Sequence, residues 1–218
     1  MSKKKNDGSR YRPATALVLA GRSPFEYDGF VNTPLFRGYT VLYETYDDLI
    51  AHRGRYTYGR RGPPTADALA KSLAEFENSA GVVLTPSGLS AISTALLAVV
   101  KSGDHILVAD TVYRPTRNIC DTVLKRLGVE TTYYDPLIGP GIKSLLRANT
   151  TAVYLEAPGS QSFEMQDVPA ITKVTAAHGA VSLIDNTWAT PLYFRPHEHG
   201  VDISIQAGTK YLGGHSDI

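Results

Sequence analysis

This sequence of 218 residues has very little cysteine and almost no excess of either charge. It contains one cysteine and one tryptophan, and its 22 Lys and Arg residues stand against 21 Asp and Glu residues, for a formal net charge of +1. The lone Cys120 excludes an internal disulfide framework and fits a reducing compartment, so we expect a cytoplasmic protein. Because Cys120 lies in an apolar helical pattern, we expect it in the core. The balanced charge gives no sign of a nucleic-acid partner.

Long apolar runs and metal-ligand spacings are also missing. No apolar stretch approaches the roughly 18 residues that a membrane span needs. Residues 1–10, MSKKKNDGSR, carry charge without an apolar centre, which predicts a solvated tail. His178 and His215 have no partner at the spacing of a metal site. We therefore expect neither a membrane partner nor a metal.

Two regions of different character follow one another along the chain. Residues 1–62 are rich in Tyr, Arg and Gly and show no regular apolar period. Such a segment has little means to form its own core, so we expect an extended arm that packs on another subunit. From residue 63 to residue 218 the pattern becomes regular, which predicts one domain. Its first helix is expected over 65–78, with Thr65 as the cap.

The second region alternates short apolar runs with helical patterns. We expect strands over 81–86, 105–110, 129–136, 151–158, 180–186 and 201–208, and helices over 65–78, 87–103, 113–128, 141–149 and 168–179. Continuous Val, Ile and Leu runs between helices are typical of parallel strands that are covered on both faces. The predicted fold class is α/β, with a mostly parallel sheet and helices on both of its faces.

Ligands of such sheets bind at the carboxyl ends of the strands. That rule selects a set of residues that would share one edge of the sheet: Ser87, Gly88, Tyr113, residues 156–160, Asp185, Asn186, Thr209 and Lys210. Among them, TPSGLSA places a Ser-Gly turn before a helix, where free N–H groups and the helix dipole can hold a phosphate. By itself this pattern more often only caps a helix, and it lacks the P-loop and dinucleotide fingerprints.

Asp185 and Lys210 make the set more specific. Asp185 ends an apolar strand, where it either caps a turn or acts as counter-ion to a protonated ring nitrogen, as pyridoxal phosphate (PLP) requires. Lys210 is either a surface lysine or, in a dry pocket, a nucleophile with a lowered pKa. Tyr113 could stack on a ring, and Tyr58 and Arg60 could clamp a phosphate. The conjunction is more informative than each part.

The motifs resemble those of one family. YGRRGPPT, TPSGLSA, DTVYRPT, YLEAPGS, LIDNTWATP and DISIQAGTKYLGGHSD are similar to segments of the PLP enzymes of cysteine and methionine metabolism, from about Arg55 to the chain end. The resemblance implies PLP as cofactor. It also implies the fold type I large domain, which is like that of aspartate aminotransferase, preceded by an arm.

Roles follow from the resemblance, residue by residue. Lys210 corresponds to the Schiff-base lysine, Asp185 to the partner of the pyridine nitrogen, and Tyr113 to the stacked ring. Phosphate ligands would be the backbone N–H groups of Gly88 and Leu89 and the Thr209 hydroxyl. Tyr58 and Arg60 would reach the phosphate of a neighbouring subunit in a homotetramer. The expected catalytic residues are Lys210, Tyr58 and Tyr113.

Three features favour the cystathionine β-lyases within the family: GPPT at 62–65, PGS at 158–160, and Trp188. They imply β-elimination of L-cystathionine to homocysteine, pyruvate and ammonia. Other readings stay open. They are a γ-lyase or γ-replacement enzyme (methionine γ-lyase, cystathionine γ-synthase, homoserine sulfhydrylase), a non-catalytic cofactor-binding module, and a nucleotide-binding domain.

The sequence departs from the family in two ways. Ala207 stands where many relatives have a serine, so one hydroxyl to the phosphate is expected to be missing. Relatives also continue past the lysine into a C-terminal domain that supplies an arginine for the substrate carboxylate, whereas this sequence ends at Ile218. We expect the 218 residues to hold the arm and the cofactor domain and to need that further domain for turnover.

Overall fold

A computed structural model describes residues 11–217 of the chain. Its backbone contacts divide the chain into two compact units, Met1–Leu84 and Thr85–Ile218. The units are described separately below. The sequence predicts a functional division into an arm over 1–62 and a cofactor domain over 63–218. This division is defined by contacts with a ligand and with other subunits, and it stays a prediction.

The first unit is built from short helices joined by irregular segments. They are α1 (Pro13–Leu19), η2 (Pro24–Glu26), α2 (Tyr46–Ile50), η3 (Gly59–Arg61) and α3 (Pro64–Glu77). Within residues 11–84 no hydrophobic side chain is buried. Phe25 is 97% exposed and Leu42 is 88% exposed. This segment therefore has no apolar core of its own in the described residues.

The expected cap of helix α3 is wrong. The helix begins at Pro64 after Pro63, and no side chain caps it. The Thr65 hydroxyl instead donates to the Pro34 carbonyl and accepts from the Phe36 N–H, both at 2.9 Å. Pro64 has no backbone N–H, so the first position of the helix leaves no donor that a cap would have to satisfy. Thr65 is thus free to tie the preceding segment of the unit to the helix.

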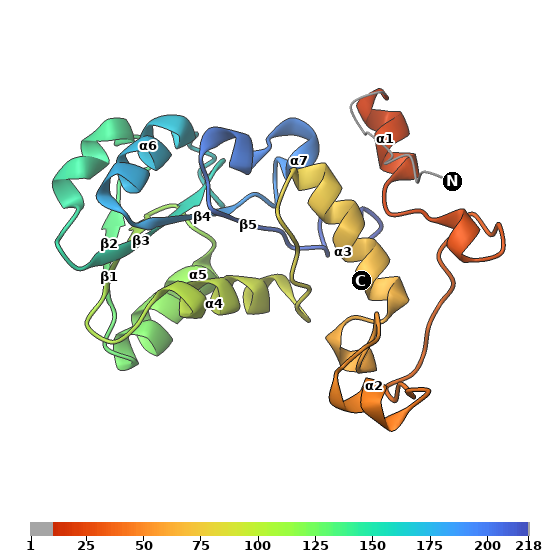
Figure 1. Ribbon diagram of the computed structural model, residues 1–218. Helices are drawn as coiled ribbons and strands as arrows, with labels where there is room; N and C mark the ends of the chain where they lie inside the picture. The colour runs from red at the N-terminus through yellow and green to blue at the C-terminus, as the bar shows by residue number, and fades with distance from the viewer. Residues whose placement is uncertain (1–10, 218) are drawn as a thin grey trace. The chain divides into compact units, whose positions relative to one another are not determined.

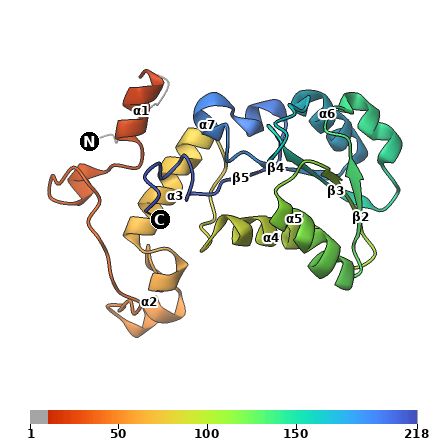
Figure 2. The ribbon, with the colours of Figure 1, turned by 180° about the vertical axis from the view of Figure 1, so that it is seen from behind.

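The second unit is a parallel sheet in the order β2-β1-β3-β4-β5. The strands are β1 (His105–Ala109), β2 (Glu130–Tyr134), β3 (Thr150–Glu156), β4 (Val181–Asp185) and β5 (Ile203–Ile205). Figure 1 shows helices α4 (Gly88–Val99) and α5 (Arg114–Asn118) on one face and α6 (Val168–His178) on the other, and Figure 2 shows the same layers from behind. The predicted α/β class with helices on both faces is confirmed.

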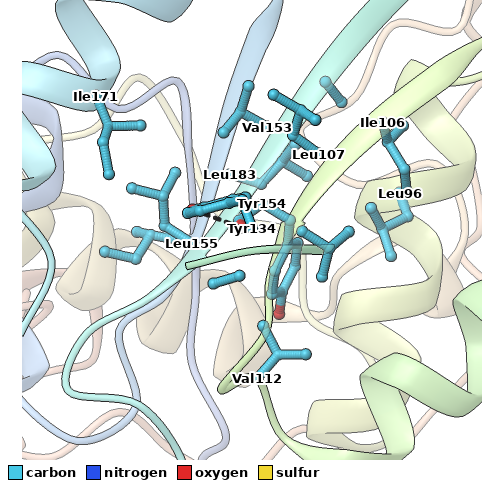
Figure 3. Close-up of a cluster of buried hydrophobic side chains, with 14 of the residues drawn as sticks. Leu96, Ile106, Leu107, Val112, Tyr134, Val153, Tyr154, Leu155, Ile171 and Leu183 are labelled. Carbon is cyan, nitrogen blue, oxygen red and sulfur yellow. Dashed lines mark hydrogen bonds between the residues drawn. The ribbon is translucent and has the colours of Figure 1, made fainter. Parts of the chain in front are cut away.

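The core of this unit lies on both faces of the sheet. All five residues of β1 are buried, and β3 is buried at six of its seven positions. Figure 3 shows this cluster, in which side chains of the strands meet those of α4 and α6. Tyr134 is buried there with its hydroxyl paired, since it donates to the Tyr154 carbonyl at 3.2 Å and to Gln166 Oε1 at 2.8 Å. Cys120 is buried in the same cluster, as predicted.

Several elements differ from the predicted ones. Residues 81–86 form no strand, and Val83 is 82% exposed, because within the described chain no other strand lies beside them. The helix expected over 141–149 is a 3₁₀ helix, η5 (Gly139–Leu145), and the strand expected over 201–208 is only β5. Helix α5 continues as a π-helix, η4 (Ile119–Leu124). Short helices α7 (Thr190–Tyr193) and η6 (Pro196–His199) separate β4 from β5.

Among the helices of residues 11–217, none has both the length and the apolar character that crossing a membrane requires.

Candidate active site

A cavity of about 670 Å³ lies at the carboxyl edge of the sheet in the second unit. Its wall contains every predicted site residue of that unit: Gly88, Leu89, Tyr113, Asp185, Thr209 and Lys210. They come from the start of α4, the turn after β1, the end of β4 and the segment after β5. The rule that ligand sites gather at the carboxyl ends of parallel strands thus selected residues that share one cavity, although Asn186, which it also selected, is buried outside the cavity wall.

The start of helix α4 forms one side of the cavity. The Ser87 hydroxyl accepts from the Ser90 N–H at 3.1 Å and caps the helix. The N–H groups of Gly88 and Leu89 donate to no other group of the described chain. Free amides at the positive end of a helix dipole attract an anion. This end of the cavity is therefore suited to a phosphate.

Asp185 brings an acidic side chain to another part of the cavity wall. It ends β4, and its Oδ1 accepts from the Thr187 N–H at 3.0 Å, as the turn-capping reading predicted. Burial raises the pKa of Asp185, and the hydrogen bonds from Thr187 act in the other direction. No ion pair to Asp185 forms within residues 11–217. A carboxylate so placed gains from a cationic partner, so the counter-ion reading also fits.

Thr187 connects this carboxylate to the lysine segment, a role that the sequence reading missed. Its N–H donates to Asp185, and its hydroxyl accepts from the Ala207 N–H at 2.9 Å. The Lys210 N–H in turn donates to the Ala207 carbonyl at 3.1 Å. Two short turns are thereby tied together through one threonine. A hydroxyl two residues after a strand-end aspartate was the available signal.

Lys210 is exposed in the described chain, so these residues alone form no dry pocket around it, and its role as a nucleophile stays a prediction. Its Nζ lies 3.5 Å from the Thr209 hydroxyl and forms no ion pair among residues 11–217. The residue follows the last strand and has only turns around it, which explains its access to solvent. The amine still lines the cavity and is open to an incoming carbonyl group.

Glu156 is a site residue to which the sequence reading assigned no role. It is the last residue of β3, it is 8% exposed, and it lines the cavity. Its Oε2 accepts from the Tyr113 N–H at 2.8 Å. Burial, followed by the charge of Asp185, raises the pKa of Glu156 to about 8. A carboxylate that ends the apolar run TAVYL was the signal for it.

Aromatic rings line another part of the cavity wall. Trp188 makes edge-on contacts with Phe163 and Tyr211, at ring-centroid distances of 5.4 and 5.3 Å. All three residues are more than half exposed. Edge-on geometry is the favoured arrangement of aromatic pairs. Trp188, noted in the sequence for its residue type alone, is therefore part of the cavity wall.

Tyr58 and Arg60 belong to the first unit. Tyr58 directly precedes η3, and the Arg60 guanidinium lies 5.9 Å from the centre of the Tyr39 ring. Both residues are exposed. Their role toward a neighbouring subunit stays a prediction. Among residues 11–217, no three His, Cys, Asp or Glu side chains are grouped as a metal site.

A family model described as Cys/Met metabolism PLP-dependent enzyme matches residues 14–218. The chain belongs to this family. Among curated members, a Rhizobium johnstonii protein provisionally named cystathionine beta-lyase is 56% identical over 204 residues, which are 94% of this chain and 52% of that one. The cystathionine beta-lyase of Haemophilus influenzae is 41% identical over 218 residues, with 96% of this chain and 55% of that one covered.

Solved structures of this family show the same architecture. MetB from Corynebacterium glutamicum superposes with a TM-score of 0.91 at 32% identity, over 97% of this chain and 54% of that one. The second unit thus has the fold type I architecture of PLP-dependent enzymes, as the resemblance implied. The chain spans about half the length of these relatives.

Proposed function

We propose that this chain builds the cofactor site of a PLP-dependent carbon–sulfur lyase that converts L-cystathionine to homocysteine, pyruvate and ammonia by β-elimination. The observation that carries the proposal is the meeting of Asp185, Lys210 and the free amides of α4 on one cavity. Family membership supports the cofactor class, and the names of the Rhizobium and Haemophilus relatives support the substrate.

The residues of the cavity fit the parts of PLP. We assign the phosphate to the N–H groups of Gly88 and Leu89 and to the Thr209 hydroxyl, and the ring to the Tyr113 side chain. Asp185, whose burial calls for a positive partner, is assigned to the ring nitrogen. A volume of about 670 Å³ lies within the range of small-molecule sites.

When bound, PLP supplies a ring that accepts the electron pair released at the substrate Cα. Asp185 would keep the ring nitrogen protonated, and Tyr113 would hold one face of the ring. Lys210 Nζ would hold the cofactor and would also be the base that takes the proton from the substrate Cα. As the Cβ–S bond breaks, the protonated Lys210 would return that proton to the leaving sulfur of homocysteine. Tyr58 is the proposed helper in these proton transfers. The three-carbon enamine left after homocysteine departs would be hydrolysed by one water molecule to pyruvate and ammonia.

The first unit supports a proposal about assembly. It exposes large apolar side chains, with Phe25 and Leu42 as the extremes, and no hydrophobic side chain of residues 11–84 is buried. We assign these surfaces to contacts with neighbouring subunits in a homotetramer. Tyr58 and Arg60 would then reach the phosphate in an adjacent copy, where a phenol and a guanidinium are good partners for it.

The keto acid that forms tests the reaction type. A protein that carries this chain together with the C-terminal domain expected of the family is incubated with PLP and L-cystathionine, and the products are separated and quantified. Pyruvate with homocysteine supports β-elimination, whereas 2-oxobutyrate with cysteine would replace the proposal by a γ-lyase. The matched control is Lys210→Ala, which removes the proton carrier and should abolish either product. Turnover that persists in this variant would contradict the role of Lys210.

A further inference from the structure

The crossing point of the sheet brings Glu156 and Tyr113 together. In the order β2-β1-β3-β4-β5, β2 lies on one side of β1, and the following strand, β3, lies on the other side. Strand order therefore reverses between β1 and β3, which is where ligands of doubly wound sheets bind. Tyr113 follows β1 and Glu156 ends β3. The two residues thus face each other across the point that the topology selects.

A hydrogen bond joins them. Glu156 Oε2 accepts from the Tyr113 N–H at 2.8 Å. Tyr113 is the residue before helix α5, and the Thr116 N–H donates to its carbonyl at 2.8 Å. The peptide group on each side of the Tyr113 Cα is thereby held. The Tyr113 side chain is 45% exposed and lies in the cavity wall. The position of its ring therefore depends on the main-chain hydrogen bond to Glu156, which we call the anchor.

The anchor itself is rigid. Glu156 is 8% exposed, and its main-chain carbonyl accepts from Gln166 Nε2 at 2.8 Å. Gln166 Oε1 in turn accepts from the hydroxyl of the buried Tyr134 at 2.8 Å. The end of β3 is thus fixed through a chain of buried groups. A side chain that extends from such a position has little freedom to follow a moving loop.

Glu156 also lies beside the proposed counter-ion. In the register of β3 and β4, Glu156 pairs with Asp185, and paired residues of adjacent parallel strands point to the same face. Neither carboxylate forms an ion pair within residues 11–217. The other groups that face Glu156 are the Ser160 hydroxyl and Tyr154 of the same strand. Burial and the neighbouring Asp185 raise the pKa of Glu156 to about 8, which makes a negative charge on Glu156 less favourable than on a solvent-exposed carboxyl.

We propose that Glu156 is a positioning residue of the cofactor site: through the Tyr113 N–H it fixes the tyrosine ring on the cavity wall that Asp185 shares. The inference rests on the proposed function in one respect, that the ring held there belongs to PLP. Glu156 acts through Tyr113 and takes no part in proton transfer.

The test compares Glu156→Ala with Glu156→Gln. The alanine variant leaves the partly buried Tyr113 N–H without its acceptor, while the glutamine variant offers an amide oxygen to the same N–H. We expect the Kd for PLP to rise roughly tenfold in Glu156→Ala and to return close to the parent value in Glu156→Gln. Kd is followed through the fluorescence of Trp188, the only tryptophan of the chain.

A double-mutant cycle makes the test specific to positioning. In a Tyr113→Ala background, Glu156→Ala should change Kd little further, because the ring that it positions is gone. The control is Asp202→Ala, which removes hydrogen bonds from the Ser182 N–H and hydroxyl, both 2.8 Å, away from the cavity wall. It should lower stability and leave Kd unchanged. Additive effects of Glu156→Ala and Tyr113→Ala would overturn the inference.

Hydrogen exchange separates this inference from the proposed function. In the protein without PLP, the Tyr113 amide should exchange at least several-fold faster in Glu156→Ala than in the parent and be protected again in Glu156→Gln. Unchanged exchange would overturn the positioning role, whatever the protein binds. Failure of the parent protein to bind PLP, together with the expected exchange pattern, would instead overturn the proposed function alone.

Discussion

Gly88 lies against Ala207 with no room for a side chain between them. A Cβ added to Gly88 would come within 2.8 Å of the Ala207 Cβ and 3.3 Å of its Cα. The start of helix α4 and the segment that leads to Lys210 are therefore packed backbone to backbone. This contact brings the proposed phosphate site and the proposed lysine to the same cavity.

Gly88→Ala tests that contact. The added methyl group should push the two segments apart and lower the free energy of unfolding by about 1–3 kcal/mol. PLP binding should weaken as well, because the amides of α4 move away from Thr209. Gly81→Ala is the matched control, since a Cβ there would meet no atom within 4 Å. Equal stability and PLP affinity in both variants would contradict the role of the contact.

Trp188 should report binding at the cavity. It is the only tryptophan, it lies in the cavity wall, and it contacts Phe163 and Tyr211. Titration with PLP should quench its emission and saturate, because an aromatic ligand within the same cavity takes up its excitation energy. Pyridoxal without phosphate should need a far higher concentration, since it lacks the anion that α4 attracts. Equal titration curves for both compounds would argue against a phosphate site.

Three apolar runs of similar character have different outcomes in the fold. The apolar runs ILVA and TAVYL predicted buried strands correctly, since each has a neighbour on both sides in the sheet. GVVLTP carries the same signal but forms no strand, because a strand needs a partner and the described chain offers none beside it. The strand propensity of a segment does not say which other segment of the chain will pair with it.

The site could be predicted where a rule links residue type to position. Strand ends selected Gly88, Tyr113, Asp185, Thr209 and Lys210, and one cavity unites them. Glu156 and Thr187 were missed as partners because their roles depend on hydrogen bonds to the Tyr113 and Ala207 amides. The residue types marked both positions, but the sequence does not say which main-chain amide each side chain would meet. For Lys210 the sequence left an exposed and a buried position open, because the choice between them depends on packing.

Protonation of His105 should weaken the fold. His105 is fully buried, and its ring nitrogens lie 2.8 Å from the Thr150 hydroxyl and 2.9 Å from the Thr132 hydroxyl. Burial, then the charge of Arg147, lowers the pKa of His105 in the folded protein. The unfolded chain therefore takes up the proton first as the pH falls. Stability from this residue is full above about pH 6.5 and is lost as the pH drops below that value.

Urea unfolding at a series of pH values checks this prediction. Between about pH 7 and pH 5.5, the parent should lose up to roughly 1.4 kcal/mol per pH unit through His105. The loss should be smaller in His105→Gln, and His215→Gln, which changes an exposed histidine, should follow the parent. If the free energy of unfolding depended on pH in the same way in the parent and in His105→Gln, His105 would have the same pKa in the folded and the unfolded state, and the prediction would be wrong.

Cys120 should be unreactive in the folded protein. Burial, the largest cause, raises the pKa of its thiol to about 12, and the thiolate is the reactive form. Iodoacetamide at about pH 8 should label the native protein far more slowly than the urea-unfolded protein, which is the internal control. Mass spectrometry gives both rates. Equal labelling in the two states would mean that the core around Cys120 opens readily.

The apolar surface of the first unit should hold copies of the chain together. Leu42→Asp places a charge where 88% of the side chain is exposed, and it should shift the assembly to a smaller species. Lys173→Asp, on the exposed face of α6 in the second unit, is the control and should leave the assembly unchanged. Multi-angle light scattering gives the masses. A parent that is already monomeric at micromolar concentration would contradict the proposed homotetramer.

The most direct test of the account is chemical labelling of Lys210. The protein is incubated with PLP, reduced with sodium borohydride and digested, and the pyridoxyl-labelled peptide is identified by mass spectrometry, with Lys210→Ala treated in parallel. The account predicts one stoichiometric label, on Lys210, and none in the variant. A folded protein that carries no label, or that carries it equally on other lysines, would contradict the claim that this cavity is a PLP site.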